Sequence, residues 1–205
     1  MKGKILLTGY ETFLDIKVNP SIEAARLLEG KTYHGYKIVI EELPMKYAEI
    51  RDIIRELVEK HEPAAVICTG VSSIGTGITV ERVAINMGNA REGDDFGYTE
   101  VDQILNPNGP VAYWSTLPIR EIMEKINENG IPAYISNSAG TQGCNLVFYH
   151  LMDYIAEKNM GIPGGFIHLP RLPENAVNSR NPSMSLMDSG KALEVAVKVV
   201  ARKLP

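Results

Sequence analysis

Short apolar runs alternate along the chain with longer segments whose apolar positions recur at helical spacing. The clearest longer segment is 46–60, whose apolar stripe consists of Ile50, Ile53, Ile54, Leu57 and Val58. Asn19, which is followed by proline, is typical of the residue that caps the start of a helix. Helices are predicted at 20–28, 46–60, 118–129, 145–158 and 184–203. Strands are predicted at 4–7, 36–43, 64–68, 78–86, 133–136 and 165–169.

This alternation predicts an α/β fold, an α/β/α sandwich with a twisted and mainly parallel central sheet. The length of 205 residues favours one domain that spans 1–205. In such sheets the functional loops follow the carboxyl ends of the strands, which selects 9–20, 70–77 and 136–144. The long polar segment 88–110 is interpreted either as a lid or as an assembly arm.

The composition of the chain argues against several classes of function. The chain has 21 Lys and Arg against 25 Asp and Glu, and this net charge of −4 disfavours a nucleic-acid partner. Its apolar runs are shorter than the roughly 20 residues that span a bilayer, and the first is too short for a signal-peptide core. The only cysteines, Cys68 and Cys144, exclude a disulfide scaffold or a zinc site of several thiolates. We therefore expect a soluble, cytoplasmic protein without a membrane partner.

Cys144 has the strongest local context for chemistry. It follows a segment rich in glycine and serine and opens the helix predicted at 145–158. The positive end of the helix dipole and its free N–H groups favour the nucleophilic thiolate there. A small buried apolar side chain is the alternative, and position alone supports both equally. Cys68 lies inside an apolar strand, where the buried interpretation is favoured.

A nucleophilic cysteine needs a base, and the sequence offers four histidines. His168 lies near the carboxyl end of the last predicted strand, where α/β enzymes place catalytic groups. His150 shares a helix with Cys144 but faces another direction about 9 Å further along the axis, so it is a poor base. A hydrogen-bonded core histidine is the alternative for His168, and its pairing with Cys144 favours catalysis.

Glu81 is the candidate for the group that orients the imidazole. The apolar alternation along 78–86 shifts by one residue across Glu81 and Arg82, which indicates a bulge or a twist that re-aims a side chain. An exposed Glu–Arg pair on an edge strand is the alternative, and spacing alone favours it. The glycine-rich stretch 70–77 lacks the spacing of a phosphate-binding loop, and no residues have convincing metal-ligand spacing.

Taken together, the motifs resemble the pyrrolidone carboxyl peptidases, also called pyroglutamyl peptidases of type I. The resemblance covers nearly the whole chain, with its motifs in the family's order. The matching segments are Thr8-Gly9-Tyr10-Glu11-Thr12-Phe13, Asn19-Pro20-Ser21, Val80-Glu81-Arg82-Val83-Ala84-Ile85-Asn86, Ala112-Tyr113, Thr116-Leu117-Pro118, Ser136-Asn137-Ser138-Ala139-Gly140, Cys144-Asn145, Phe166-Ile167-His168-Leu169-Pro170 and Pro182-Ser183-Met184.

This resemblance implies a cysteine peptidase that removes an N-terminal pyroglutamyl residue from peptides. It implies an α/β/α sandwich, no metal or cofactor, and a tetramer of identical chains. By motif, Cys144 is the nucleophile, His168 is the base and later the acid, and Glu81 orients the imidazole.

The resemblance also implies the substrate-binding residues. Tyr10 and Phe13 supply aromatic walls for the pyroglutamyl ring, Asn19 belongs to the same opening motif, and Arg91 helps to hold the oxyanion. Glu92 departs from the family pattern, which is apolar there, so we expect it to point to solvent or to pair with a cation.

Two other functions remain to be weighed against this one. A catalytically weak or inactive homologue that binds a small ligand would explain the departures around the ring pocket. A phosphorylase-like enzyme of similar architecture would need an anion site, for which 70–77 is the one candidate.

Overall fold

The fold is built on a mixed, mainly parallel sheet of seven strands in the order β2-β3-β1-β4-β9-β5-β8. The computed structural model describes residues 1–12, 18–90, 93–94, 96–177 and 179–205. Two neighbour pairs are antiparallel, β2 with β3 and β5 with β9, and the remaining pairs are parallel. The strands are β1 (Gly3–Tyr10), β2 (Thr32–Tyr33), β3 (Tyr36–Leu43), β4 (Ala65–Ser72), β5 (Ile78–Glu81), β8 (Ala133–Ser136) and β9 (Gly164–Pro170).

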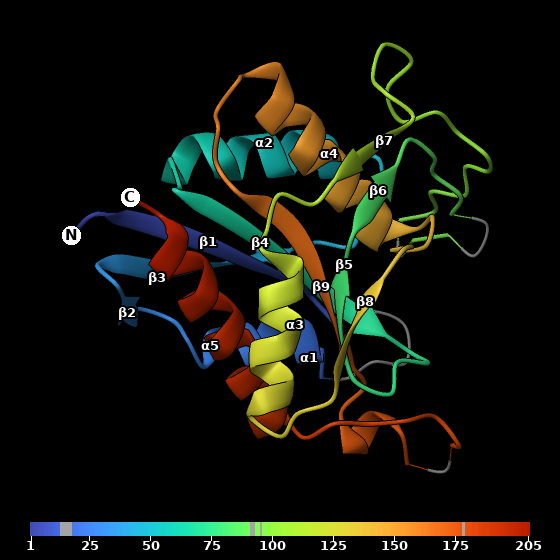
Figure 1. The fold of residues 1–205 in the computed structure, drawn as a ribbon. Coiled ribbons are helices and arrows are strands. Elements are labelled where there is room, and N and C mark those ends of the chain that lie inside the picture. The colour runs from blue at the N-terminus through green and yellow to red at the C-terminus, as the bar shows by residue number, and fades with distance from the viewer. Residues whose placement is uncertain (13–17, 91–92, 95, 178) are drawn as a thin grey trace.

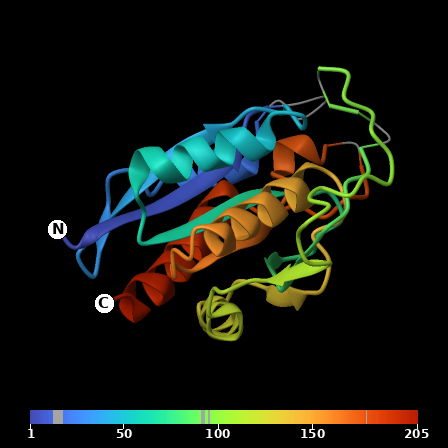
Figure 2. The same cartoon turned by 90° about the horizontal axis from the view of Figure 1, so that it is seen from above.

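Helices cover both faces of this sheet, which confirms the predicted α/β architecture (Figure 1). One face carries α1 (Pro20–Arg26), α3 (Ile119–Glu128) and α5 (Leu186–Lys203), and the other carries α2 (Ile50–His61) and α4 (Gly143–Glu157). The view from above shows α2 and α4 running side by side over the strands (Figure 2). No helix in the described ranges is long and apolar enough to cross a membrane.

Each central strand contributes side chains to both layers of the core, because successive side chains point to opposite faces of the sheet. Ile5 and Leu7 of β1 pack on the side of α1 and α5, whereas Leu6 packs on the side of α2 and α4. Burial on both faces explains why these strands are continuous apolar runs in the sequence. Helix α4 is buried along nearly its whole length, so the nucleophile candidate at its start rests on a rigid element.

The structure corrects two of the predicted elements. The strand expected at 78–86 is divided at Arg82 into β5 and β6 (Val83–Ile85). Strand β6 leaves the main sheet and pairs antiparallel with β7 (Ala112–Trp114), so the one-residue shift in apolar phase marks a change of sheet. The loop expected to begin at residue 70 begins later, because β4 continues to Ser72.

The polar segment 88–110 contains no helix or strand in its described part. It lies at the end of the molecule away from the two termini (Figures 1 and 2). The buried Asp153 of α4 holds this segment by accepting a hydrogen bond from Asn106 Nδ2. Asp153 also accepts a hydrogen bond from the Tyr113 hydroxyl of β7. Asp94 accepts a hydrogen bond of 2.8 Å from Tyr47 N.

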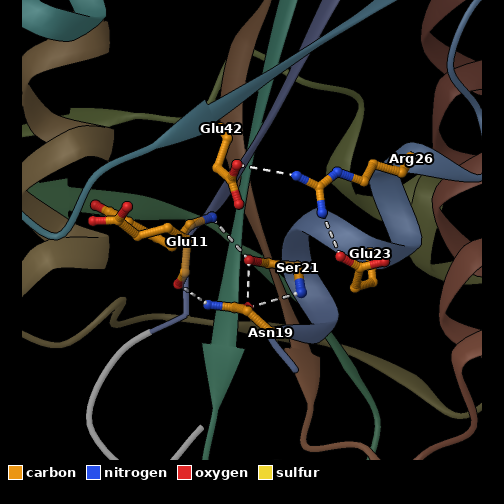
Figure 3. Close-up of polar contacts among 7 residues, drawn as sticks. Glu11, Asn19, Ser21, Glu23, Arg26 and Glu42 are labelled. Atoms are coloured by element: carbon orange, nitrogen blue, oxygen red, sulfur yellow. Dashed lines mark hydrogen bonds and ion pairs between the residues drawn. The ribbon is translucent and has the colours of Figure 1, made fainter. Parts of the chain in front are cut away.

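Asn19 caps α1 as the sequence predicts, and its side chain also joins the helix to the end of β1 (Figure 3). Its Oδ1 accepts hydrogen bonds from Ser21 N and Ser21 Oγ, at 3.0 and 2.7 Å, and its Nδ2 donates to the Glu11 carbonyl at 2.8 Å. Ser21 Oγ accepts from Tyr10 N at 3.0 Å. All of these groups are buried or partly buried, so their hydrogen bonds replace lost contacts with water.

We predict that Asn19→Ala lowers the free energy of unfolding by about 2 kcal/mol, because it removes a helix cap and leaves buried polar groups without partners. Urea denaturation measures this loss. Ser185→Ala is the matched control, because Ser185 caps α5 through exposed hydrogen bonds only: its Oγ accepts from Asp188 N and donates to Asp188 Oδ2. A loss for Asn19→Ala no greater than that for Ser185→Ala would contradict the bridging role.

Candidate active site

Cys144 is the second residue of α4, at the end of the helix whose N–H groups are not bonded within it. Gln142 precedes the helix in an extended conformation and provides no side-chain cap. Gly140 makes the preceding turn at a φ of +77°, a conformation that favours glycine. The thiol therefore lies beside free backbone donors and the positive end of the helix dipole.

Close packing fixes the backbone on either side of the thiol. The Tyr10 hydroxyl donates a hydrogen bond of 2.7 Å to the Gly143 carbonyl. A Cβ at Gly143 would lie 2.5 Å from the Tyr47 ring, and a Cβ at Gly70 would lie 2.8 Å from Cys144 Sγ. Both glycines are needed because the helix start lies directly against a tyrosine ring and against β4.

His168 and Glu81 form a buried pair beside this thiol. His168 lies on β9 and is paired in register with Gly70 of β4 and Thr79 of β5. Its Nδ1 lies 2.8 Å from Glu81 Oε1, and only 7% of His168 and 1% of Glu81 is exposed. Spacing alone favoured an exposed Glu81–Arg82 pair, and that prediction is wrong because Glu81 is buried against His168.

The surroundings of His168 favour its protonated form. Burial by itself lowers the pKa of His168, but the neighbouring Cys144, through its charge and a hydrogen bond, and then Glu81 raise it to about 10. The Cys144 sulfur and the Glu81 carboxyl group thus both stabilise an imidazolium at His168. This arrangement provides both a nucleophile and a proton donor at one point.

The other cysteine and the other helical histidine lie in environments that suppress their chemistry. Cys68 is fully buried, and burial is the main cause that raises the pKa of its thiol to about 12. His150 is also buried, and burial followed by the charge of Arg51 lowers its pKa to about 4. Cys68 therefore remains a thiol near neutral pH, and His150 remains neutral.

A pocket of about 580 Å³ opens in front of the thiol and the imidazole. Two of the loops selected from the sequence form its walls, the segment after β4 and the segment between β8 and α4. Ser72, Thr79 and Ser136 supply hydroxyl groups to the lining. Its remaining lining residues are Val71, Ser73, Ile74, Glu81, Tyr134, Ser138, Ala139, Gly140, Thr141, Gln142, Cys144 and His168.

Of the residues expected to bind substrate, the two that the structure describes, Tyr10 and Asn19, do not line this pocket. Tyr10 is 3% exposed and supports Gly143 through its hydroxyl, while Asn19 is 1% exposed and caps α1. Phe13, Arg91 and Glu92 lie outside the described residues.

Sequence reasoning missed the positioning residue Asn145. It is fully buried, its Oδ1 accepts from Ile85 N at 2.9 Å, and its Nδ2 donates to the Ile85 and Met87 carbonyls at 2.9 and 2.8 Å. These bonds tie the start of α4 to β6, which directly follows Glu81 and Arg82. The available signal was a single amide in an otherwise apolar stretch of helix. No group of three or more His, Cys, Asp or Glu is placed to hold a metal ion in the described part of the chain.

Comparison with known proteins gives a consistent result. The family model described as pyroglutamyl peptidase matches residues 3–203. The pyrrolidone-carboxylate peptidase of Bacillus subtilis (strain 168) is 41% identical over 202 residues, which cover 98% of this chain and 94% of the relative. The crystal structure of Bacillus amyloliquefaciens pyroglutamyl peptidase I superposes with a TM-score of 0.95 at 42% identity, over 98% of this chain and 97% of that one. The pyrrolidone carboxyl peptidase from Thermococcus litoralis gives a TM-score of 0.94 at 34% identity, over 98% and 94% of the two chains.

We predict that limiting iodoacetamide labels Cys144 faster than Cys68 by on the order of 100-fold or more, because Cys144 is partly exposed at a helix start beside His168, whereas Cys68 is fully buried. Peptide mapping by mass spectrometry measures the two rates. Cys144→Ser should abolish the fast phase, and His168→Ala should slow labelling of Cys144. Faster labelling of Cys68 would remove the basis for assigning Cys144 as the nucleophile.

Proposed function

The chain belongs to the pyroglutamyl peptidase family, and from that premise we propose that Cys144, His168 and Glu81 are the catalytic triad of a cysteine peptidase that removes N-terminal pyroglutamyl residues. The observation that carries this assignment is the buried His168–Glu81 pair, joined at 2.8 Å beside a thiol at a helix start. The three groups come from β9, β5 and α4, so the fold rather than local sequence brings them together.

In the first half of the reaction the Cys144 thiolate attacks the carbonyl carbon between pyroglutamate and the next residue. A carbon–sulfur bond forms, and the carbonyl oxygen becomes an oxyanion that accepts hydrogen bonds from the free N–H groups at the start of α4. His168 then gives its proton to the leaving nitrogen as the carbon–nitrogen bond breaks. The products are a thioester on Cys144 and the shortened peptide.

In the second half, neutral His168 takes a proton from water, and the resulting hydroxide attacks the thioester. The carbon–sulfur bond breaks, free pyroglutamate leaves, and the thiolate–imidazolium pair is restored. Glu81 accepts a hydrogen bond from Nδ1, which directs Nε2 toward the reacting atoms and stabilises the imidazolium.

The pyroglutamyl ring carries no free α-amine, so a pocket with apolar walls and a few lactam hydrogen bonds rejects charged peptide N-termini. Ring recognition by Phe13 and the contact of Arg91 with the oxyanion stay predictions. Tyr10 and Asn19 support the substrate site indirectly. Tyr10 holds the Gly143 carbonyl beside Cys144, and Asn19 caps α1 and anchors the segment before it.

We further propose that residues 1–205 form one domain and that four copies of the chain assemble into a homotetramer. The tetramer acts in the cytoplasm, and its substrates are peptides with an N-terminal pyroglutamate. The exposed apolar side chains of Ile104, Val111 and Trp114 support assembly. Two free cysteines, one of them reactive in this mechanism, support a reducing compartment.

We predict that His168→Ala lowers kcat for a fluorogenic pyroglutamyl amide by about 1,000-fold or more, because both proton transfers are lost. His150→Ala is the control, since it removes a buried histidine from the same protein without touching the reacting groups. Rates are compared at a temperature where circular dichroism shows every variant folded. A larger loss of kcat for His150→Ala than for His168→Ala would overturn the triad. Wild-type protein that is inactive on every pyroglutamyl amide would instead favour the ligand-binding homologue.

The pH profile tests Glu81. Because His168 must be protonated to release the amine, kcat/KM should fall as pH rises through the pKa of His168, which is about 10. Glu81→Gln removes a negative charge that raises this pKa, so the alkaline limb should move down by about 1 pH unit while some activity remains. Glu81→Asp, which keeps the charge, should shift the limb less. An unchanged limb in Glu81→Gln would exclude electrostatic control by Glu81.

A further inference from the structure

The peptide unit that joins Gly143 to Cys144 is held from its carbonyl side by Tyr10. The Tyr10 hydroxyl donates a hydrogen bond of 2.7 Å to the Gly143 carbonyl, and only 3% of Tyr10 is exposed. A trans peptide unit is planar, and its N–H points away from its carbonyl. A bond that fixes the direction of the Gly143 carbonyl therefore also fixes the direction of the Cys144 N–H.

The Cys144 N–H is available to a substrate. The first backbone bond at this helix start runs from Leu146 N to the Gln142 carbonyl, at 3.0 Å. Gln142 provides no side-chain cap, and no acceptor for Cys144 N lies among the residues that the structure describes. This N–H belongs to the nucleophile itself, so it lies beside the sulfur and can donate to an oxyanion on the attacked carbon.

The bond from Tyr10 adds to the bonding of the helix. Gly143 is the first residue of α4, so its carbonyl also takes part in the hydrogen-bond ladder of the helix. A second donor on the same carbonyl polarises the peptide unit and makes its N–H a stronger donor. The gain is larger toward a charged acceptor, so it favours the oxyanion over the neutral carbonyl of the substrate.

The Tyr10 hydroxyl is a lasting donor in a fixed place. Burial, followed by the neighbouring charge of Cys144, raises the pKa of Tyr10 well above its usual value, so the phenol stays protonated. The main chain is fixed as well, because Tyr10 N donates to Ser21 Oγ at 3.0 Å and Ser21 Oγ donates to Asn19 Oδ1. The hydroxyl can therefore bind the Gly143 carbonyl throughout the reaction.

We propose that Tyr10 is a positioning residue for the transition state, whose hydroxyl orients and polarises the Gly143–Cys144 peptide unit so that the Cys144 N–H binds the oxyanion. The proposal rests on the proposed function, because it takes attack of Cys144 on a peptide carbonyl as the reaction. It assigns Tyr10 to the chemical step and not to recognition of the pyroglutamyl ring. Loss of the hydroxyl should therefore lower kcat and leave KM nearly unchanged.

Tyr10→Phe removes the hydroxyl and keeps the ring. We expect kcat and kcat/KM for a fluorogenic pyroglutamyl amide to fall about tenfold each, with KM within about twofold of wild type. Pyroglutamyl aldehyde tests the same contact without turnover, because the thiolate adds to its carbonyl carbon and leaves the negative charge on the oxygen. Its inhibition constant should rise by the factor by which kcat/KM falls. Alkylation of Cys144 by iodoacetamide displaces iodide from a saturated carbon and forms no oxyanion, so its rate should stay within about twofold of wild type.

Tyr36→Phe is the matched control. Tyr36 is also 3% exposed, and its hydroxyl also donates to a main-chain oxygen, that of Pro205. It lies at the amino end of β3, whereas Cys144 lies near the carboxyl end of β4, beside Gly70. All of these measurements should match wild type, at a temperature where circular dichroism shows every variant folded.

Four outcomes would contradict the proposal. An unchanged kcat and an unchanged aldehyde inhibition constant in Tyr10→Phe would overturn it. A rise in KM alone would overturn it and place Tyr10 against the pyroglutamyl ring. An equal loss of alkylation and turnover would overturn it in favour of general support of the Cys144 thiolate. Wild-type protein that is inactive on the amide would refute the proposed function, and this proposal with it.

Discussion

The site depends on one row of residues that are paired in register across three neighbouring strands of the sheet. Gly70, His168 and Thr79 are neighbours in register on β4, β9 and β5, and all three face the layer of α2 and α4. Glu81 lies two residues after Thr79, so its side chain points to the same face and reaches Nδ1 of His168. The glycine in this row leaves the space that the Cys144 sulfur occupies. A shift of one residue in either strand pairing would turn the imidazole or the carboxylate to the opposite face.

The position of α4, which carries Cys144, is fixed as closely as the pairing of these strands. Asn145 makes two hydrogen bonds to Ile85 of β6 and one to Met87 just after it, and Gly143 is fixed between the Tyr10 hydroxyl and the Tyr47 ring. An apolar helix could slide along an apolar sheet at little cost, because dispersion contacts are not directional. These polar contacts and close approaches at its first turn define one position for the thiol. Precision at the site therefore depends on groups beside Cys144 that do no chemistry.

Local patterns in the sequence predicted much of the fold but little of this geometry. The strands at 36–43 and 133–136 have the predicted bounds, and the other predicted helices and single strands differ at their ends by a few residues. The prediction of a single strand at 78–86 was wrong because periodicity detects a change of phase but not a change of partner strand. Glu81 and His168 are 87 residues apart, so spacing could not show that they pair. The change of apolar phase made Glu81 a candidate to orient the imidazole, and the family resemblance assigned it that role. Neither could reveal the role of Gly70.

Hydrogen bonds and a ring contact connect the segment 88–110 to the residues around Cys144. Asn89 N donates a hydrogen bond of 2.7 Å to the Thr141 carbonyl, just before α4 begins. Asp94 accepts from Tyr47 N, and the Tyr47 ring packs on Gly143 and meets Tyr98 edge to face. Two independent contacts thus connect this segment to the residues on which the Cys144 backbone rests. A displacement of the segment would move the free N–H groups at the start of α4 relative to the carbonyl under attack, so its packing is a condition for transition-state stabilisation as well as for the shape of the surface.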